Sequence, residues 1–375
     1  MKGSVHKRDN GSYLIRISLG RDQDGKRIYH TRTVNGTKKE AEKLCRDLVS
    51  QFETGGIVAD PKLSLNAFLN EWLEVAKKPK VAPRTYNSYR GDLDRYVKGG
   101  LGRMPLAKIS VMDIQGLYQG LNEQGLSGGT IRRLHTVLNQ AFKQAVRWRK
   151  LIYNPAADAE LPARKRQKVL RAFNKQQANL FMQHAQETSH ALLFEVAMFS
   201  GMRPGEYLGL TWDCVDWDAG TVRVEKAVCR PAGEKPYFGP PKTPESNRTI
   251  PLPESTMMKL RAQRAHVNQM RLLEGPNWTD LNLVFPNTKG GFWDLRNLSQ
   301  RVFKNVLKAA GLSSDFRLYD LRHTCATLLL LADENVKVVS ERLGHSSVKL
   351  TLDTYSHVLP SMQKRATEKL ASLFA

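Results

Sequence analysis

Tyr319-Asp320-Leu321-Arg322-His323, Leu343-Gly344-His345 and Thr354-Tyr355 follow one another near the C-terminus of this chain of 375 residues. One loop far upstream, Ser200-Gly201-Met202-Arg203-Pro204-Gly205-Glu206, completes the set. Two arginines, a histidine and a tyrosine are the side chains that phosphoryl transfer without a metal requires. The guanidinium groups neutralise a phosphodiester, the imidazole holds or moves a proton, and the phenol attacks phosphorus. The motifs therefore predict one catalytic site assembled from distant parts of the chain.

Each motif residue has a role that fits this chemistry. Arg203 precedes Pro204, which favours the first turn of a helix, so Arg203 is expected at a helix N-terminus, where anions bind. Arg322 supplies the second guanidinium, and His345 can donate to a phosphate oxygen. Tyr355 is the predicted nucleophile; because a phenol titrates near ~10 in water, it needs positive charge nearby. Taken singly, each is more often a surface or packing residue, and the combination carries the prediction.

The net charge of +22 points to a polyanionic partner, although a basic protein without nucleic acid has the same composition. Lysine and arginine exceed aspartate and glutamate in each of the segments 1–62, 63–165 and 166–375, as expected of a protein that wraps DNA with all its domains. The four cysteines are widely spaced, which fits a reducing cytosol and argues against a zinc or disulfide framework. No signal peptide or membrane-spanning stretch is recognised, so a cytoplasmic protein is expected.

The first part of the chain, 1–60, predicts a small sheet followed by one helix. Residues 12–34 alternate like two antiparallel strands, with turn residues at 21–25. Thr37 and Glu40 form a capping box for a helix that ends near 52. Such a module could lay a β-ribbon in a DNA groove, or simply present a basic surface. The candidate DNA-binding residues are Arg16, Arg27 and Arg32.

The second part, 63–162, predicts four helices. Apolar residues recur at helical spacing from Leu65, and Pro83 suits the start of the second helix. Ser110 with Asp113 can cap the third helix, and Ser127 opens the fourth. The apolar stripe of the fourth helix is expected to be core. Its basic residues lie partly off that stripe and are candidates for phosphate contacts, chiefly Arg132, Arg133 and Arg147.

The third part, 163–375, begins within a short basic linker at 161–168. Helix is predicted from about 174 to 200, strand over 212–228 with a turn at 218–220, and strand again at 248–252. The prolines of 229–246 exclude a central strand there. The remainder is expected to be mainly helical. No Walker motif is present, so no nucleotide energy source is indicated.

These motifs resemble the catalytic boxes of the tyrosine recombinases, the family of the phage integrases. The segment from Lys242 to Leu252 is similar to the family's Lys-Thr…Ser-x-Arg-x-Ile-Pro-Leu hairpin. By that match Lys242, and not the nearby Lys235, would be the general acid that protonates the leaving 5′-oxygen. From the residues alone, a lysine in a proline-rich loop is usually only solvated. The family's second box usually reads His-x-x-Arg, and here Tyr319 takes the place of the histidine.

Tyr319 is therefore expected to contribute a hydrogen bond and not proton transfer, because a phenol is a poor base near neutral pH. His323 is interpreted as supporting structure. Beyond Tyr355, a rough apolar stripe is expected either to dock on a neighbouring protomer or to pack on its own domain; it comprises Met362, Ala366, Leu370, Leu373 and Phe374.

The resemblance implies a multidomain α+β fold. A small three-stranded sheet plus helix would form an arm-type DNA-binding domain (1–60), followed by a helical core-binding bundle (63–162). A mainly helical catalytic domain with a small antiparallel sheet would follow (163–375). The implied reaction is cleavage to a 3′-phosphotyrosine, strand exchange and religation, with no metal or other cofactor. The implied partners are double-stranded DNA at core and arm attachment sites and a homotetramer on paired sites, with an excisionase and a DNA-bending host factor as further candidates.

The function expected from this resemblance is that of a site-specific integrase of a prophage or integrative mobile element, acting in integration and excision at the nucleoid of a bacterial cytoplasm. The β-rich module at 1–60 favours an integrase over the chromosome-dimer resolvases, which usually lack it. Two alternatives remain open. One is a catalytically inactive architectural or regulatory DNA-binding protein. The other is a type IB topoisomerase, which shares the chemistry but relaxes supercoils without paired sites.

Overall fold

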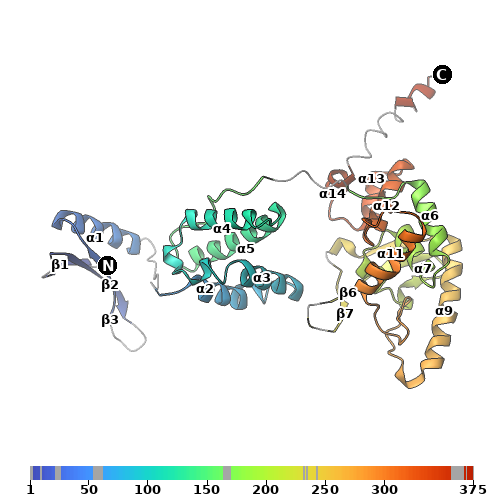
Figure 1. Ribbon diagram of the computed structural model, residues 1–375, viewed down its shortest axis with the longest axis horizontal. Helices are drawn as coiled ribbons and strands as arrows, with labels where there is room; N and C mark the ends of the chain where they lie inside the picture. Colours follow the sequence, from blue (N-terminus) through green and yellow to red (C-terminus); the bar gives the residue numbers. More distant parts are fainter. Residues whose placement is uncertain are drawn as a thin grey trace. The chain divides into compact units, whose positions relative to one another are not determined.

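A computed structural model covers the chain, and its two compact units are Met1–Gln167 and Lys168–Ala375 (Figure 1). The structure describes all residues except 1–2, 9–10, 22–26, 54–61, 164–169, 231–232, 234, 242–243, 356–366, 369 and 375. Side chains are also left undescribed at 19–21, 27–28, 30, 50–53 and 244. The predicted turn at 21–25 and the expected domain boundary near 61 therefore lie largely or wholly outside the described residues.

The first unit begins with the expected three-stranded antiparallel sheet and helix. Strands β1 (Gly3–Lys7), β2 (Tyr13–Arg21) and β3 (Arg27–Val34) are ordered β1-β2-β3, and α1 (Lys38–Glu53) follows. The predicted capping box is confirmed: the Thr37 amide donates to Glu40 Oε2 (2.8 Å) and the Glu40 amide to Thr37 Oγ1 (3.4 Å). A small apolar core joins sheet and helix and comprises Ile15, Ile17, Cys45 and Leu48.

A second hydrophobic core in this unit belongs to the predicted helices. They are α2 (Leu65–Glu71), α3 (Pro83–Tyr96), α4 (Val111–Glu123) and α5 (Gly128–Arg147), with a π-helical turn at Trp72–Lys77 and 3₁₀ turns at Leu101–Arg103 and Leu106–Lys108. Ser110 caps α4 in a reciprocal box with Asp113, and Ser127 caps α5 by accepting from the Thr130 amide. The apolar stripe of α5 is buried, as expected for the amphipathic helix.

The second unit is mainly helical. Its helices are α6 (Lys175–Ala185), α7 (Ala191–Ser200), α8 (Pro204–Tyr207), α9 (Glu254–Glu274), α10 (Leu295–Asn297), α11 (Phe303–Ala309), α12 (Asp320–Leu331), α13 (Val336–Leu343) and α14 (Val348–Tyr355), and a π-helical turn spans Leu298–Val302. Its strands are β4 (Val215–Asp216), β5 (Thr221–Val224), β6 (Ala227–Cys229), β7 (Tyr237–Gly239) and β8 (Arg248–Pro251). They form an antiparallel sheet β4-β5-β8 and a hairpin β6-β7.

A helix and a strand that were predicted to be continuous are interrupted in the structure. The helix expected over 174–200 is interrupted between α6 and α7 by turns in which the Thr188 hydroxyl donates to the Ala185 carbonyl. The strand expected over 212–228 begins as a 3₁₀ turn at Trp212–Cys214 and then divides into β4, β5 and β6. Its turn is where it was predicted, because Asp216 accepts two backbone N–H bonds there and Gly220 has φ +63°.

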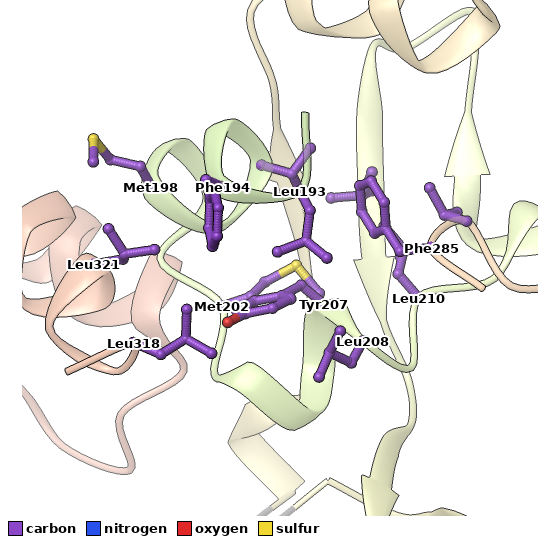
Figure 2. Packing of buried hydrophobic residues seen from close by; sticks show 14 of the residues in the cluster. Leu193, Phe194, Met198, Met202, Tyr207, Leu208, Leu210, Phe285, Leu318 and Leu321 are labelled. Atoms are coloured by element: carbon purple, nitrogen blue, oxygen red, sulfur yellow. The ribbon is translucent and has the colours of Figure 1, made fainter. Parts of the chain in front are cut away.

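The main core of the second unit fixes the loop after α7 against the start of α12. Figure 2 shows Met202 of this loop and Tyr207 of α8 lying between Phe194 of α7 and Leu318 near α12. All four side chains are at least nine-tenths buried. Because α12 also contacts α7 and α13, two motifs that are far apart in the sequence are held side by side. The core therefore positions the predicted catalytic motifs next to one another.

Among the described residues, no helix is both long enough and apolar enough to cross a membrane.

Candidate active site

Arg203 lies in the loop between α7 and α8, directly before the first residue of α8. The chain turns at Gly201 (φ +65°), where a Cβ would lie 2.9 Å from Leu343 and 3.2 Å from Cys325, so a side chain is excluded. Arg203 then precedes Pro204 as expected and has extended backbone. Its Nη1 donates to Glu206 Oε1 (2.7 Å), and its Nη2 donates to the Gly344 carbonyl (3.3 Å). About a fifth of its side chain is exposed, which leaves it accessible to an anion.

Glu206 is a buried counterion for two arginines. It is only 2% exposed and accepts from Arg203 on one oxygen, while Arg248 Nη2 donates to the other at 2.9 Å. Burial by itself would raise the pKa of Glu206, but the guanidinium of Arg248, with that of Arg203, outweighs it and lowers the pKa. Arg248 Nε also donates to the Arg342 carbonyl (2.6 Å). This network joins α8, β8 and α13 around Arg203.

Arg322 is almost completely buried, with 1% of its surface exposed. Its Nη1 donates to the Gly201 carbonyl (2.7 Å) and its Nη2 to the Leu343 carbonyl (2.6 Å). Burial, together with the positive charge of Arg203, lowers the pKa of Arg322 to about 10, so the side chain remains charged at neutral pH. Arg322 therefore connects the loop before Arg203 with the end of α13.

His345 follows the Gly344 turn (φ +62°) that ends α13. Its Nδ1 lies 2.8 Å from Thr351 Oγ1 in α14. Burial and the guanidinium groups of Arg322 and Arg203 lower the pKa of His345 to about 4. The imidazole is therefore neutral at pH 7. It keeps one N–H donor, which can serve a phosphate oxygen once the tautomer is fixed.

Tyr355 ends α14 and is 1% exposed. Its hydroxyl lies 2.9 Å from Nδ1 of His323 in α12. Burial raises the pKa of the Tyr355 phenol, and the guanidinium of Arg322 opposes that rise. Tyr319, just before α12, is 38% exposed, and its ring stands edge-on to that of His323 with centroids 5.1 Å apart. The rings of Tyr319 and Tyr355 thus both contact the imidazole of His323.

Comparison with known proteins agrees with this geometry. The sequence profile of the phage integrase family matches residues 168–362, more than half of the chain. The chain belongs to the phage integrase family. A second profile, the N-terminal SAM-like domain of phage integrases, matches residues 64–122. The protein is thus a tyrosine recombinase, an enzyme that breaks and rejoins DNA strands in site-specific recombination.

The similarity to known proteins extends over nearly the whole length of this recombinase. The tyrosine recombinase XerC-like protein of Caldanaerobacter subterraneus subsp. tengcongensis is 29% identical, with 96% of each chain covered. The ICEBs1 integrase of Bacillus subtilis is 28% identical over 99% of this chain and all of its own. Among solved structures, a Tn1549 transposon integrase in complex with transposon right end DNA has a TM-score of 0.69 at 20% identity, covering 82% of this chain and 100% of that one. A lambda integrase dimer bound to a core site has a TM-score of 0.56 at 17% identity, covering 93% of each chain.

The sequence analysis predicted four catalytic residues in this recombinase, Arg203, Arg322, His345 and Tyr355. The structure brings them together. Lys242 lies outside the described residues. The sequence analysis missed a role for the Glu206–Arg248 pair, although both residues stand inside quoted motifs. It also missed the contact of His323 with Tyr355, for which the sequence gives no signal.

The basic residues expected to contact DNA fall into two groups. Arg133 forms a bidentate ion pair with Asp92 (2.7 and 2.8 Å), and Arg132 Nη2 donates to the Pro162 carbonyl (2.5 Å), so both have partners within the protein. Arg16, Arg32 and Arg147 are exposed, as Arg133 also is, and the Arg16 guanidinium lies 3.7 Å above the centroid of the Tyr29 ring. Arg27 lies in β3, and its side chain is outside the described part of the chain.

One group of potential metal ligands occurs among the described residues. Ligand atoms of Asp213, Cys214 and Glu225 lie within 4.8 Å of one another. The two carboxylates are also paired with cations, Asp213 with Lys226 (3.7 Å) and Glu225 with Arg223 (3.1 Å). Because these cations already offset the negative charge that would attract a metal ion, we assign no metal site to this group.

The pKa of His345 predicts a pH effect on stability. The folded protein holds this imidazole at a pKa of about 4, below the ordinary value near ~6.5, so between these pH values the unfolded chain binds a proton that the folded chain does not. The stability contributed by neutral His345 is therefore lost as pH falls below about 6.5. We expect His345→Asn to reduce the drop in thermal unfolding temperature between pH 7 and pH 5.

Part of the drop in unfolding temperature should remain in His345→Asn, because burial also lowers the pKa of His135 and His190. The exposed His266 offers a matched control, and His266→Asn should leave the pH dependence unchanged. An identical drop in unfolding temperature for wild type and His345→Asn would contradict the assignment.

Proposed function

We propose that this recombinase is the integrase of a prophage or integrative mobile element and that it catalyses both integration and excision through a 3′-phosphotyrosine intermediate. The observation that carries the proposal is the convergence of Arg203, Arg322, His345 and Tyr355 from four separate segments. Relatives named for mobile elements, ICEBs1 among curated proteins and Tn1549 among solved structures, support the biological setting.

In the proposed site, Arg203 and Arg322 hold the non-bridging oxygens of the scissile phosphate. The exposed part of Arg203 is the side that the phosphate reaches, while Arg322 is fixed by two backbone carbonyls and cannot swing away. Both charges are in place before DNA binds, which lowers the reorganisation needed as negative charge grows on the oxygens. His345 donates a hydrogen bond to one of these oxygens.

Tyr355 is proposed as the nucleophile. Its oxygen forms a bond to phosphorus as the bond from phosphorus to the 5′-oxygen breaks, leaving a 3′-phosphotyrosine and a free 5′-hydroxyl. Lys242 is proposed as the general acid that protonates the leaving 5′-oxygen, on the strength of the hairpin motif alone. Tyr319 is proposed to supply a hydrogen bond, consistent with its exposed position before α12.

We further propose that the chain is organised as an arm-type DNA-binding domain (1–60), a core-binding domain (63–162) and a catalytic domain (163–375). Separate hydrophobic clusters in the first two segments support this division. Among the arginines predicted to bind DNA, the exposed Arg16, Arg32 and Arg147 are favoured for phosphate contacts. Arg133 is less suited, since its guanidinium is committed to Asp92.

The proposed assembly is a homotetramer on paired core sites, with arm sites bound by the first domain. A lambda integrase tetramer bound to a Holliday junction has a similar fold. Leu370, Leu373 and Phe374 are 57%, 78% and 86% exposed, which supports docking of this segment on a neighbouring protomer; Met362 and Ala366 lie outside the described residues. An excisionase and a DNA-bending host factor are proposed as further partners, and the nucleoid of a bacterial cytoplasm as the place of action.

Strand exchange between two defined sites is the direct test of this function. Purified protein, incubated with two labelled duplexes carrying the element's attachment sites, should yield recombinant duplexes of the predicted lengths. Duplexes with scrambled core sites should remain unchanged, because the sites specify where strands are cut. Relaxation of any supercoiled plasmid without recombinant products would instead indicate a type IB topoisomerase.

A further inference from the structure

The described part of the site leaves one proton without an assigned acceptor. When Tyr355 attacks phosphorus, its phenol must lose a proton, yet burial makes that loss unfavourable for the isolated side chain. Tyr319, at the position where related enzymes usually carry a histidine, is a phenol and is a poor base. Some other group must therefore take the proton, or the proton must leave through solvent.

His323 is the base that the fold places against the nucleophile. It lies in α12, and its Nδ1 is 2.9 Å from the Tyr355 hydroxyl, within the range expected for proton transfer. With the ring proton on Nε2, Nδ1 accepts a hydrogen bond from the phenol. The Tyr319 ring, packed edge-on, restricts the imidazole from one side. This arrangement already exists in the protein without DNA.

The competing bases of the described site are engaged with other groups. His345 Nδ1 is in contact with Thr351, and its pKa of about 4 makes it a weaker base than an ordinary imidazole. Glu206 accepts hydrogen bonds from Arg203 and Arg248 on its two oxygens, and these guanidinium groups lower the pKa of the carboxylate. Among these groups, His323 is the imidazole whose ring nitrogen directly contacts the attacking oxygen.

We infer that His323 is a catalytic residue of this recombinase and accepts the phenol proton of Tyr355 during strand cleavage. The inference rests on the proposed function, in which Tyr355 is the nucleophile. It assigns chemistry to a residue that sequence analysis interpreted as structural. The observation behind it is the direct contact between imidazole Nδ1 and the attacking oxygen.

Over strand cleavage and religation together, each proton that is transferred has a named donor and acceptor. In cleavage, the Tyr355 oxygen bonds to phosphorus, its proton moves to Nδ1 of His323, and the bond to the 5′-oxygen breaks. The general acid, proposed to be Lys242, gives a proton to that oxygen. In religation, a 5′-hydroxyl attacks the phosphotyrosine and returns a proton to the acid, while the protonated imidazole of His323 returns its proton to the departing Tyr355 oxygen. No metal, oxidant or other reactant is consumed.

Several titratable or charged groups among the described residues face the imidazole or its partner. They are Tyr355 from α14, Tyr319 from the segment before α12, His345 from the segment after α13, and Arg322 and Cys325 on α12 itself. The pKa of His345 lies near 4, that of Arg322 near 10, and that of Tyr355 is raised. An inflection of the cleavage rate between pH 5.5 and 8.5 that is lost in His323→Asn is therefore assigned to His323.

The test measures single-turnover cleavage of a nicked suicide duplex taken from DNA flanking the gene, between pH 5.5 and 8.5. His323→Asn places an amide oxygen near the position of Nδ1, so it keeps a hydrogen bond to Tyr355 but cannot take up a proton. We expect it to cleave about 10²- to 10⁴-fold more slowly at pH 7 and to lose the fall in rate at acid pH. In His323→Ala, added imidazole should restore part of the rate. His266→Asn, at an exposed histidine on α9, is the matched control.

Thermal unfolding and DNA binding of each variant show whether the fold and the complex are retained. If His323→Asn folds, binds DNA and cleaves within about threefold of wild type with the same pH profile, the imidazole only positions Tyr355 and the inference is wrong. The same holds if His323→Asn fails to fold and imidazole restores no activity to a folded His323→Ala. The proposed function is judged by a separate result. If wild type forms no adduct at Tyr355, both the inference about His323 and the proposed function are wrong. If only Tyr355→Phe loses the adduct, the proposed function stands.

Discussion

Replacing Tyr355 with phenylalanine is expected to abolish the covalent protein–DNA adduct. The substitution removes the only atom of this side chain that can attack phosphorus, and phenylalanine cannot be activated by the neighbouring Arg322 or His323. The ring is buried and is retained, so packing should change little. Loss of the hydrogen bond to His323 should cost about 1 kcal/mol of stability.

The measurement is denaturing gel electrophoresis after incubation with a nicked suicide duplex, in which the released strand diffuses away and the adduct accumulates. Wild type should give a shifted band that survives denaturation, and Tyr355→Phe should give none while binding the same duplex. Tyr319→Phe is the matched control, because this exposed phenol is proposed to contribute only a hydrogen bond and its variant should still form the adduct. An adduct of normal yield in Tyr355→Phe would show that another residue attacks, and its absence in Tyr319→Phe would show that the role of Tyr319 is larger.

Local features of the fold were predictable because they depend on neighbours in the sequence. The capping boxes of Thr37 with Glu40 and of Ser110 with Asp113 join residues three apart, and their hydrogen bonds form where expected. The buried stripe of α5 follows from helical spacing alone. The π-helical turn at Trp72–Lys77 was not predicted, because its i→i+5 hydrogen bonding departs from that spacing.

The catalytic candidates were predictable for a different reason. Their residue types are those that the chemistry needs and their motifs resemble the family's catalytic boxes, so Arg203, Arg322, His345 and Tyr355 could be proposed from the sequence alone. The residues that support them could not be identified in this way. The contact of His323 with Tyr355 depends on how α12 packs beside α14, and the pairing of Glu206 with Arg248 depends on how β8 lies beside α8. Such long-range contacts leave no periodic trace in the sequence.

Replacing Glu206 with glutamine is expected to have the largest effect on stability. Glutamine keeps the shape and one acceptor oxygen but removes the negative charge that offsets Arg203 and Arg248. Arg248 is only 7% exposed, so its guanidinium would be left buried without a counterion. Removing one partner of a buried ion pair typically costs about 3–5 kcal/mol, and we expect a loss in this range.

The same substitution should impair cleavage, because Glu206 holds the guanidinium of Arg203, which is proposed to bind the scissile phosphate. A misplacement of roughly 1 Å at a positioning group can cost about 10²-fold in rate, and a decrease of this order is expected in conditions where the variant is folded. Urea unfolding followed by tryptophan fluorescence measures the stability, and single-turnover adduct formation measures the rate.

Glu341→Gln is the control for loss of a carboxylate from an ion pair on the same unit. Glu341 faces Lys337 across 3.9 Å on α13, and both side chains are about two-thirds exposed or more. Water screens such a pair, so its loss should change stability by less than about 1 kcal/mol. If Glu206→Gln were no more destabilising than Glu341→Gln, the buried network would not hold the site together, and the position of Arg203 would have to be fixed by its contact with the Gly344 carbonyl instead.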